Sequence, residues 1–211
     1  MNHKFIVIEG LIGAGKTSLA KKIAERYNAK LILEQFADNP FLPKFYKDPE
    51  KYSFPLELSF LAERYKQLKE DLGTGDLFKS FLISDYYFTK SLIFAKSTLA
   101  DDEFHLFRNL FHIIHNSLPK PDLYVYLHLK PENALKNIKS RGRDYEQSID
   151  FDYLNALNKS YFDYFKYEKN LKILIIDTNG IDFVNRQSDF ESLVNTIFNY
   201  EYPCGLSTKI L

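Results

Sequence analysis

Residues 4–18 read KFIVIEGLIGAGKTS, and they carry the strongest structural signal in the chain. The apolar run Lys4–Glu9 is too short for a helix, and a segment of helical period follows near 16–28. Between them, Gly10–Thr17 has the spacing G-x-x-x-x-G-K-T. A glycine-rich turn there can aim backbone N–H groups at a phosphate, and the following helix adds the positive end of its dipole. The stretch therefore predicts a phosphate-binding loop of an α/β protein.

The residues expected to hold ATP form one continuous run. They are Gly10, Leu11, Ile12, Gly13, Ala14, Gly15, Lys16, Thr17 and Ser18. Lys16 would reach the β- and γ-phosphates and assist catalysis, and the Thr17 hydroxyl would be a ligand of Mg²⁺. ATP and Mg²⁺ are therefore the predicted cofactors. A chance glycine-rich turn before a lysine is the alternative, but it does not explain strand, loop and helix in this order.

The rest of the chain alternates short apolar runs with longer helical segments. The runs are Lys4–Glu9, Lys30–Leu33, Phe81–Ser84, Asp122–Leu129 and Leu171–Ile176. Helical period is found near 16–28, 54–72, 86–98, 101–117, 131–141, 150–168 and 188–200. Apolar runs without polar alternation are typical of parallel strands buried on both faces. We expect a parallel sheet flanked by helices, one domain over residues 1–200, a tail at 201–211 and a long surface loop at 39–55.

Composition limits the partners and the compartment. The chain has 211 residues, and its 28 Lys and Arg balance its 28 Asp and Glu. No overall basic field is available for non-specific binding to nucleic acid or to a membrane, so neither partner is expected. No apolar run of about 18 residues predicts a membrane span, and the first apolar run begins too close to Met1 for a signal peptide. With the single cysteine Cys204, this favours a cytoplasmic protein.

Two carboxylates follow predicted strands and should meet at the carboxyl edge of the sheet, where ligands bind in such folds. Asp85 follows the third run and could hold the metal, or it could simply cap the next helix. Glu34 follows the second run and could accept a proton from an attacking hydroxyl, although glutamates at strand ends are often only solvated. Thr17, Glu34 and Asp85 are the candidate metal ligands.

Arg141-Gly142-Arg143 follows the helical segment 131–141. Two arginines around a glycine suit a lid that closes on the triphosphate and stabilises charge in the transition state. The alternative is a basic helix C-terminus, which the helix dipole favours. We expect Arg141 and Arg143 to bind ATP, with Arg141 assisting catalysis.

Taken together, these features resemble the deoxynucleoside kinases, and above all their bacterial deoxyguanosine and deoxyadenosine kinase branch. The resemblance covers residues 5 to about 198. Its motifs are Ile8–Thr17, Glu34, Asp38–Leu42, Phe45-Tyr46, Ser53-Phe54, Phe60–Arg64, Asp85, Phe94-Ala95, Pro119–Asp122 and Arg141–Arg143. A phosphate loop is common to many enzymes, but this series in this order is specific.

The resemblance implies transfer of the ATP γ-phosphate to the 5′-hydroxyl of a deoxynucleoside. It implies that Glu34 is the base for that hydroxyl and that Tyr46 and Glu146 hold the sugar 3′-hydroxyl. Glu57 stands where the family has a base-reading glutamine, with Arg64 seven residues further along, and Phe94 falls in the same site. The implied architecture is a five-stranded parallel sheet with flanking helices, assembled as a homodimer.

One motif departs from the family pattern. The family has Asp/Glu-Arg-Ser, whereas this chain has Asp85-Tyr86-Tyr87, with one residue fewer before Phe94. Lys90 and Arg64 are the candidates to replace the missing arginine. The departure leaves the catalytic base open between Glu34 and Asp85.

Glu57 bears on the choice of nucleobase. A carboxylate offers only acceptors, and guanine presents two adjacent donors, N1–H and the 2-amino group. We therefore predict deoxyguanosine as substrate, with Arg64 or Lys90 donating to guanine O6. Glu57 could instead pair with Arg64 on the same helix and never touch the base. A deoxyadenosine kinase and, less favoured, a thymidylate-kinase-like enzyme are the alternative functions.

The segment 101–117 leaves two interpretations open. Phe104, Phe107, Leu110, Phe111 and Ile114 recur at steps of three and four residues. This spacing puts them on one helix face, which could either pack in the core or form a dimer interface.

Overall fold

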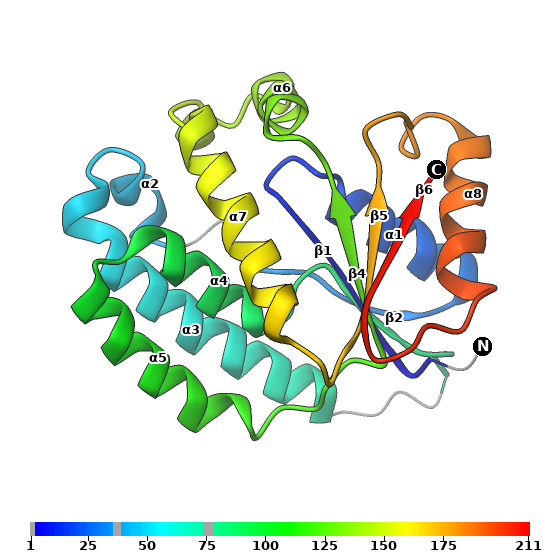
Figure 1. The fold of residues 1–211 in the computed structure, drawn as a ribbon, viewed down its shortest axis with the longest axis horizontal. Coiled ribbons are helices and arrows are strands. Elements are labelled where there is room, and N and C mark those ends of the chain that lie inside the picture. The colour runs from blue at the N-terminus through cyan, green and yellow to red at the C-terminus, as the bar shows by residue number, and fades with distance from the viewer. Residues whose placement is uncertain (1–2, 36–38, 74–77) are drawn as a thin grey trace.

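A six-stranded parallel sheet forms the centre of the protein (Figure 1). The computed structural model describes residues 3–35, 39–73 and 78–211, so Asp38 of the family motif lies outside the described residues. The strand order is β2-β3-β1-β4-β5-β6, and every neighbouring pair is parallel. The strands are β1 Phe5–Gly10, β2 Lys30–Ile32, β3 Leu82–Ser84, β4 Leu123–His128, β5 Lys172–Asp177 and β6 Gly205–Ile210.

Helices cover both faces of this sheet. They are α1 Lys16–Tyr27, α2 Leu42–Phe45, α3 Pro49–Gly73, α4 Thr89–Thr98, α5 Asp101–His115, α6 Pro131–Arg141, α7 Phe151–Tyr167 and α8 Gln187–Phe198, with a 3₁₀ turn at Asp144–Glu146. In Figure 1, α1 and α8 lie on one side of the sheet, and α3, α4, α5 and α7 lie together on the other. Within the described ranges, no helix is long and apolar enough to cross a membrane. The predicted α/β fold is confirmed.

The expectation of five strands is wrong, because Gly205–Ile210, within the segment predicted as a C-terminal tail, forms a sixth strand, β6. This strand pairs in parallel with β5, from Lys172 opposite Gly205 to Asp177 opposite Ile210. Its side chains are mostly exposed, and Leu206 and Ile210 face solvent. An edge strand held by backbone hydrogen bonds does not need the apolar run by which the other strands were predicted.

The predicted loop over residues 39–55 is also wrong in part, because it contains α2 and the first turns of α3. The helix α3 begins at Pro49, where a proline costs no hydrogen bond, and the Asp48 carboxylate accepts from the Lys51 backbone N–H at 3.3 Å. Pro55 lies inside the helix. Apolar residues of α2 and α3 pack together in a cluster of Leu42, Phe45, Leu56 and Phe60. This packing outweighs the helix-breaking tendency of Pro55.

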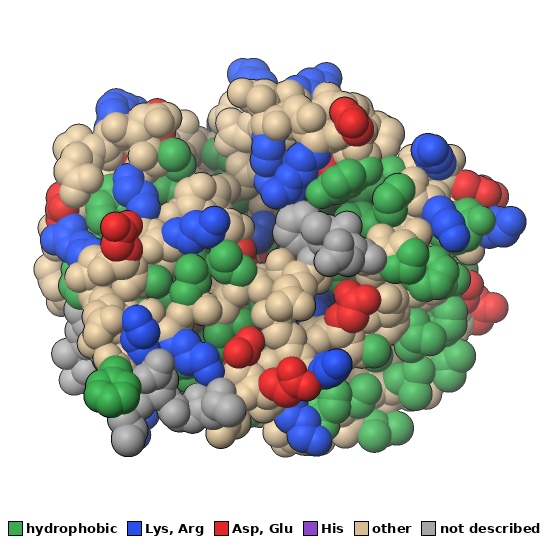
Figure 2. All heavy atoms as spheres, turned by 180° about the vertical axis from the view of Figure 1, so that it is seen from behind, with side chains coloured by type: hydrophobic (Ala, Val, Ile, Leu, Met, Phe, Trp, Pro, Cys, Tyr) green, Lys and Arg blue, Asp and Glu red, His purple; other side chains and the backbone are tan. Residues whose placement is uncertain are grey.

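The helix α5 packs against the core through the face that its sequence predicted. Phe107 and Phe111 are fully buried, and Phe104, Leu110 and Ile114 pack partly buried against them. Core packing therefore explains the apolar spacing. Other residues of this helix, Leu106 and Ile113, are exposed. The space-filling view from behind shows hydrophobic side chains gathered along one edge of the molecule (Figure 2).

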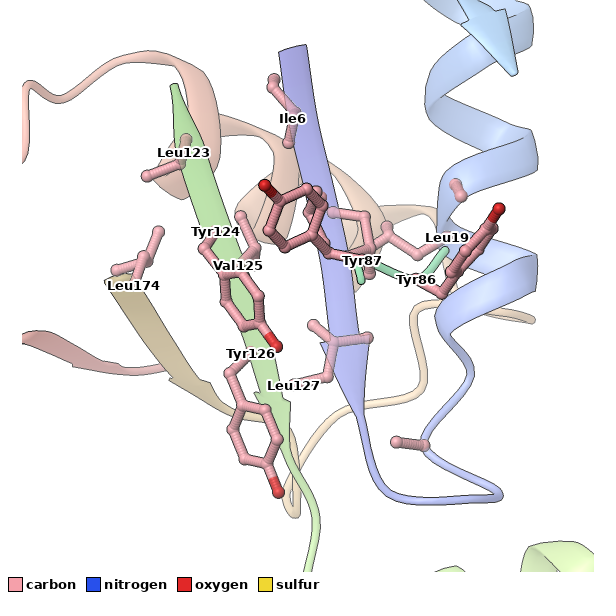
Figure 3. Packing of buried hydrophobic residues seen from close by; sticks show 14 of the residues in the cluster. Ile6, Leu19, Tyr86, Tyr87, Leu123, Tyr124, Val125, Tyr126, Leu127 and Leu174 are labelled. Atoms are coloured by element: carbon pink, nitrogen blue, oxygen red, sulfur yellow. The ribbon is translucent and has the colours of Figure 1, made fainter. Parts of the chain in front are cut away.

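The buried core runs through the sheet and includes tyrosines as well as aliphatic side chains. Tyr124 and Tyr126 lie on one face of β4, while Tyr86 and Tyr87, directly beyond β3, point in opposite directions (Figure 3). Tyr86 and Tyr87 are fully buried. The Tyr86 hydroxyl donates to Gln67 at 2.8 Å, and the Tyr87 hydroxyl donates to the Pro119 carbonyl at 3.0 Å. The residues in place of the family Arg-Ser are therefore part of the core.

Candidate active site

The loop between β1 and α1 has the geometry that its glycines predict. Gly13 and Gly15 both adopt left-handed backbone angles, with φ of 84°. A Cβ atom on Gly13 would stand 2.6 Å from the Ala134 carbonyl oxygen, and one on Gly15 would stand 2.7 Å from the Phe183 ring. Glycine is thus required at both positions for conformation and for space.

Lys16 folds back over this loop. Its Nζ donates to the carbonyl oxygens of Gly10 and Leu11, both at 2.9 Å. Burial, together with the positive charge of Lys90, lowers the pKa of Lys16 to about 8. An ammonium group held in this way is placed at the mouth of the loop, where a phosphate would sit.

Asp85 joins the loop to the neighbouring strand end. Its Oδ2 accepts from the Thr17 hydroxyl at 2.5 Å, and its Oδ1 accepts from the backbone N–H of Glu34 at 2.8 Å. Thr17 and Asp85 thus bring two hard oxygen donors together, which is the ligand chemistry of Mg²⁺. These two residues would suit Mg²⁺ as ligands.

Glu34 forms the centre of a buried charge cluster. Its Oε1 accepts from Arg64 Nε at 2.8 Å and lies 2.7 Å from Nη2, and its Oε2 accepts from Lys90 at 2.5 Å. Arg64 also donates to Ser91 at 2.9 Å. Burial alone would raise the pKa of Glu34, but the charges of Lys90 and Arg64 and their hydrogen bonds lower it to about 2. Glu34 is therefore ionised at neutral pH.

One cavity is lined by Lys16, Thr17, Glu34 and Asp85 together with the other residues predicted to bind substrate. It is lined by Ile12, Gly13, Lys16, Thr17, Glu34, Leu42, Phe45, Tyr46, Leu56, Glu57, Phe60, Arg64, Asp85, Lys90, Phe94, Arg141, Arg143, Tyr145, Glu146 and Tyr153. All eight predicted substrate residues are among them. The cavity runs from the phosphate loop to an apolar end formed by α2, α3 and α7.

Glu57 lies in the wall of this cavity and is 2% exposed. Its Oε1 accepts from the Thr98 hydroxyl at 3.1 Å, while its buried Oε2 has no hydrogen-bond partner among the described residues. Arg64 forms its ion pair with Glu34 instead of Glu57. Burial raises the pKa of Glu57 to about 7, against the opposing effects of the Arg64 charge and the Thr98 hydrogen bond.

Two arginines at the C-terminal end of α6, Arg141 in its last turn and Arg143 beyond it, reach the same cavity. Gly142 ends the helix with a left-handed φ of 70°, so the chain turns sharply between Arg141 and Arg143. Glu146 accepts at one oxygen from Arg141 Nε at 3.1 Å and at the other from Arg143 at 3.1 Å. Tyr145 stacks on Tyr46, with ring centroids 6.3 Å apart. The arginines and the predicted sugar-binding residues thus form one cluster.

Several lining residues were not predicted from the sequence. Leu56 and Phe60 flank Glu57 and Arg64 on α3 at the helical spacing 56, 57, 60 and 64, a pattern that could have identified this face. A second hollow lies on the other side of the phosphate loop and includes Asn137, Arg141 and Phe183. Asn137 donates to the Gly13 carbonyl at 2.9 Å. No sequence signal connected residues 137 and 183 to the loop.

Glu9, near the end of β1, is not among the residues that line the cavity, but it supports the turn that follows β3. It is fully buried and accepts from the Tyr87 backbone N–H at 3.1 Å and from the Tyr161 hydroxyl at 3.0 Å. It therefore fixes the turn that carries Asp85 and leads to Lys90. Burial raises its pKa above the ordinary value for a glutamate.

The sequence as a whole matches the family model described as deoxynucleoside kinase over residues 6–200. The chain belongs to the deoxynucleoside kinase family. It is 38% identical to the deoxyguanosine kinase of Bacillus subtilis (strain 168) over 194 residues, which cover 90% of this chain and 93% of that protein. It is 34% identical to the deoxyadenosine kinase of Dictyostelium discoideum over 183 residues, covering 85% and 74% respectively.

A solved structure of this family has the same fold. The deoxyadenosine kinase of M. mycoides, solved with the products dCMP and a flexible dCDP, superposes with a TM-score of 0.79 at 25% sequence identity. The match covers 93% of this chain and all of that one. As a member of the family the chain is a phosphotransferase, and the resemblance seen in the sequence is confirmed.

Proposed function

We propose that this kinase transfers the γ-phosphate of ATP to the 5′-hydroxyl of deoxyguanosine in nucleotide salvage. The observation that carries this proposal is the single cavity in which Lys16, Glu34 and Glu57 all take part. The loop lysine marks the donor end, the ionised glutamate marks the reacting hydroxyl, and the second glutamate marks the nucleobase.

At the donor end, the loop from Gly10 to Ser18 holds the phosphates of ATP. Lys16 exchanges its two loop carbonyls for phosphate oxygens and neutralises their charge. Thr17 and Asp85 would hold Mg²⁺, which when bound neutralises charge on the phosphates. Arg141 lines both this cavity and the hollow beyond the loop, and with Arg143 it supports the transferring group as a lid.

At the reacting hydroxyl, Glu34 is preferred to Asp85 as the base. Both Asp85 oxygens are bound by Thr17 and the Glu34 backbone, which suits a metal ligand. The oxygens of Glu34 are instead paired with two buried cations, Arg64 and Lys90, and this arrangement does not suit a metal ligand. The transition state of phosphoryl transfer is loose, so an ionised carboxylate serves mainly to orient the hydroxyl and accepts its proton late. Lys90 and Arg64 take over the role of the missing family arginine by holding Glu34.

At the nucleoside, Tyr46 and Glu146 hold the sugar 3′-hydroxyl and Phe94 packs on the base. Glu57 accepts from N1–H and the 2-amino group of guanine. Its unpaired Oε2 supports this role, because a buried acceptor without a partner gains most from a ligand donor. Deoxyadenosine kinase is the alternative, supported by the relatives of that name. A thymidylate-kinase-like activity is less favoured, because Tyr86 and Tyr87 are buried in the core and offer no cation to an acceptor phosphate.

We also infer a cytoplasmic homodimer. Three exposed side chains, Leu106 and Ile113 of α5 and Leu58 of α3, provide apolar surface for a second copy.

The assay that tests this function measures ATP consumption with a panel of nucleosides and nucleoside monophosphates. We expect turnover with deoxyguanosine at a higher kcat/KM than with deoxyadenosine, deoxycytidine or thymidine near pH 8. No turnover is expected with monophosphates. Turnover of thymidylate without turnover of any nucleoside would contradict the proposal, and so would a preference for deoxyadenosine at this pH.

A further inference from the structure

Glu57 is a group whose hydrogen-bonding character changes with one proton. As a carboxylate it offers two acceptors, and as a carboxylic acid it offers one donor and one acceptor. The first pattern complements the adjacent N1–H and amino donors of guanine. The second complements adenine, whose N1 is an acceptor and whose 6-amino group is a donor. The protonated acid thus has the pattern of the glutamine that the family usually carries at this position.

We propose that the active site has a second activity, the phosphorylation of deoxyadenosine, and that the protonation state of Glu57 selects between the two purines. This inference rests on the proposed function. The ionised enzyme takes deoxyguanosine, and the enzyme protonated at Glu57 takes deoxyadenosine.

The geometry around Glu57 places the exchangeable proton on the oxygen that meets the base. Oε1 accepts from Thr98 at 3.1 Å, so a proton added to the carboxyl goes to the unpaired Oε2. Thr98 Oγ1 also lies 3.0 Å from the Phe94 carbonyl, a second acceptor for the hydroxyl proton. Oε2 can therefore donate to N1 of adenine in one state and accept from N1–H of guanine in the other, since N1 is the atom that is an acceptor in one purine and a donor in the other.

The charged and titratable groups that face Glu57 come from every surrounding element. Arg64 on α3 and Lys90 on α4 favour the carboxylate, whereas Glu34 after β2 and burial favour the acid. Tyr46 beyond α2 and Tyr153 on α7 are raised in pKa and stay neutral. The two cations are already committed to Glu34. Their balance against burial leaves the pKa of Glu57 at about 7, so both states are populated near neutral pH.

The test is the ratio of kcat/KM for deoxyguanosine to kcat/KM for deoxyadenosine, measured at saturating MgATP from about pH 6 to about pH 8. Neither purine titrates in this range, and effects of pH on ATP binding or on Glu34 cancel in the ratio. We expect the ratio to rise about tenfold per pH unit, which is how the ratio of carboxylate to acid changes. The kcat/KM for deoxyguanosine should rise through its midpoint near pH 7 while that for deoxyadenosine falls.

Two variants check that Glu57 is the titrating group. Glu57→Gln should give a ratio that favours deoxyadenosine and does not change with pH. Thr98→Val removes the hydrogen bond that lowers the pKa of Glu57, so both midpoints should move to higher pH in that variant. If Thr98 had only a structural role, its substitution would not move the pH midpoints of kcat/KM for the two nucleosides.

The possible failures are distinct. A constant ratio above one would overturn this inference and leave the proposed function standing, and so would a Glu57→Gln ratio that still varies with pH. Preference for deoxyadenosine at every pH would overturn both. Absence of turnover with either purine nucleoside would show that the proposed function is wrong.

Discussion

At the scale of single residues, charge placement distinguishes the two carboxylates at the sheet edge. Glu34 and Asp85 follow neighbouring strands and are linked by the hydrogen bond from the Glu34 backbone to Asp85. Asp85 nevertheless meets a hydroxyl and an amide, while Glu34 meets two cations. The two carboxylates therefore lie in different electrostatic environments, which suit the different roles proposed for them.

This difference predicts separate effects of two conservative substitutions. Glu34→Gln should lower kcat by about 10²-fold or more with a small change in the KM for the nucleoside, because the amide keeps the shape but accepts no proton. Asp85→Asn should mainly raise the Mg²⁺ concentration that gives half-maximal rate. Steady-state kinetics with varied nucleoside and varied Mg²⁺ measure both.

The control is thermal unfolding of each variant, because Glu34→Gln leaves Arg64 and Lys90 without their counter-charge. Kinetic effects are read only at temperatures where the variant is folded. A larger loss of kcat in Asp85→Asn, with Glu34→Gln active, would assign the base to Asp85.

At the scale of elements, the phosphate loop is held between two neighbours that its own sequence does not reveal. Gly13 packs against α6 and Gly15 packs against Phe183, in the segment before α8. The Asn137 side chain on α6 completes the contact by its bond to the Gly13 carbonyl. The loop is thus shaped by elements more than 100 residues away in the chain as well as by its glycines.

Three glycine-to-alanine variants separate strain from crowding in these loops. Gly13→Ala adds both, because Gly13 has a left-handed φ and its Cβ would meet the Ala134 carbonyl. Gly142→Ala adds only the strain of a left-handed residue, about 1–2 kcal/mol, since no atom of the described residues lies within 4 Å of the added Cβ. Gly180→Ala adds neither.

We expect the KM for ATP to rise at least tenfold in Gly13→Ala and to stay within about twofold in Gly180→Ala. Gly142→Ala should lower the melting temperature and change the KM for ATP less than Gly13→Ala does. Equal KM values for ATP in Gly13→Ala and Gly180→Ala would show that the loop tolerates the crowding and does not bind phosphate in this geometry.

At the scale of the whole molecule, the candidate site and the last strand lie at different parts of the sheet, so that β6 can contribute to stability without taking part in the site. The active site lies at the carboxyl ends of β1 and β3 and just beyond β2, whereas β6 closes the opposite edge of the sheet on β5. Removal of β6 would expose the unpaired backbone of β5, a strand whose central side chains are all buried. An edge of this kind favours aggregation.

A chain that ends after Tyr202 tests this separation. Tyr202 is buried and donates to the Thr196 carbonyl at 2.6 Å, so the truncation keeps the end of α8 intact and removes β6. We expect the melting temperature to fall by at least about 5 °C, with more aggregate in size-exclusion chromatography. The kcat/KM of the soluble fraction should stay within about twofold of that of the full chain. An unchanged melting temperature would show that residues 203–211 are a dispensable tail.

Local patterns determined much of this protein. The loop at Gly10–Thr17, the five apolar strands and most helices were predictable, because spacing and periodicity are encoded over a few neighbouring residues. The carboxyl-edge position of Glu34 and Asp85 followed from the parallel sheet. Family resemblance supplied the residues predicted to bind the nucleoside, and all of them line the cavity.

Tertiary structure alone decided the rest, because it depends on contacts between distant segments. β6 is a strand because β5 offers a free edge, and α3 extends back to Pro49 because α2 packs on it. Arg64 and Lys90 both bind Glu34, whereas the sequence also allowed Arg64 to pair with Glu57. That choice leaves Glu57 buried with one oxygen unpaired. Its charge state is therefore set by packing, since burial and neighbouring charges in three dimensions determine a pKa.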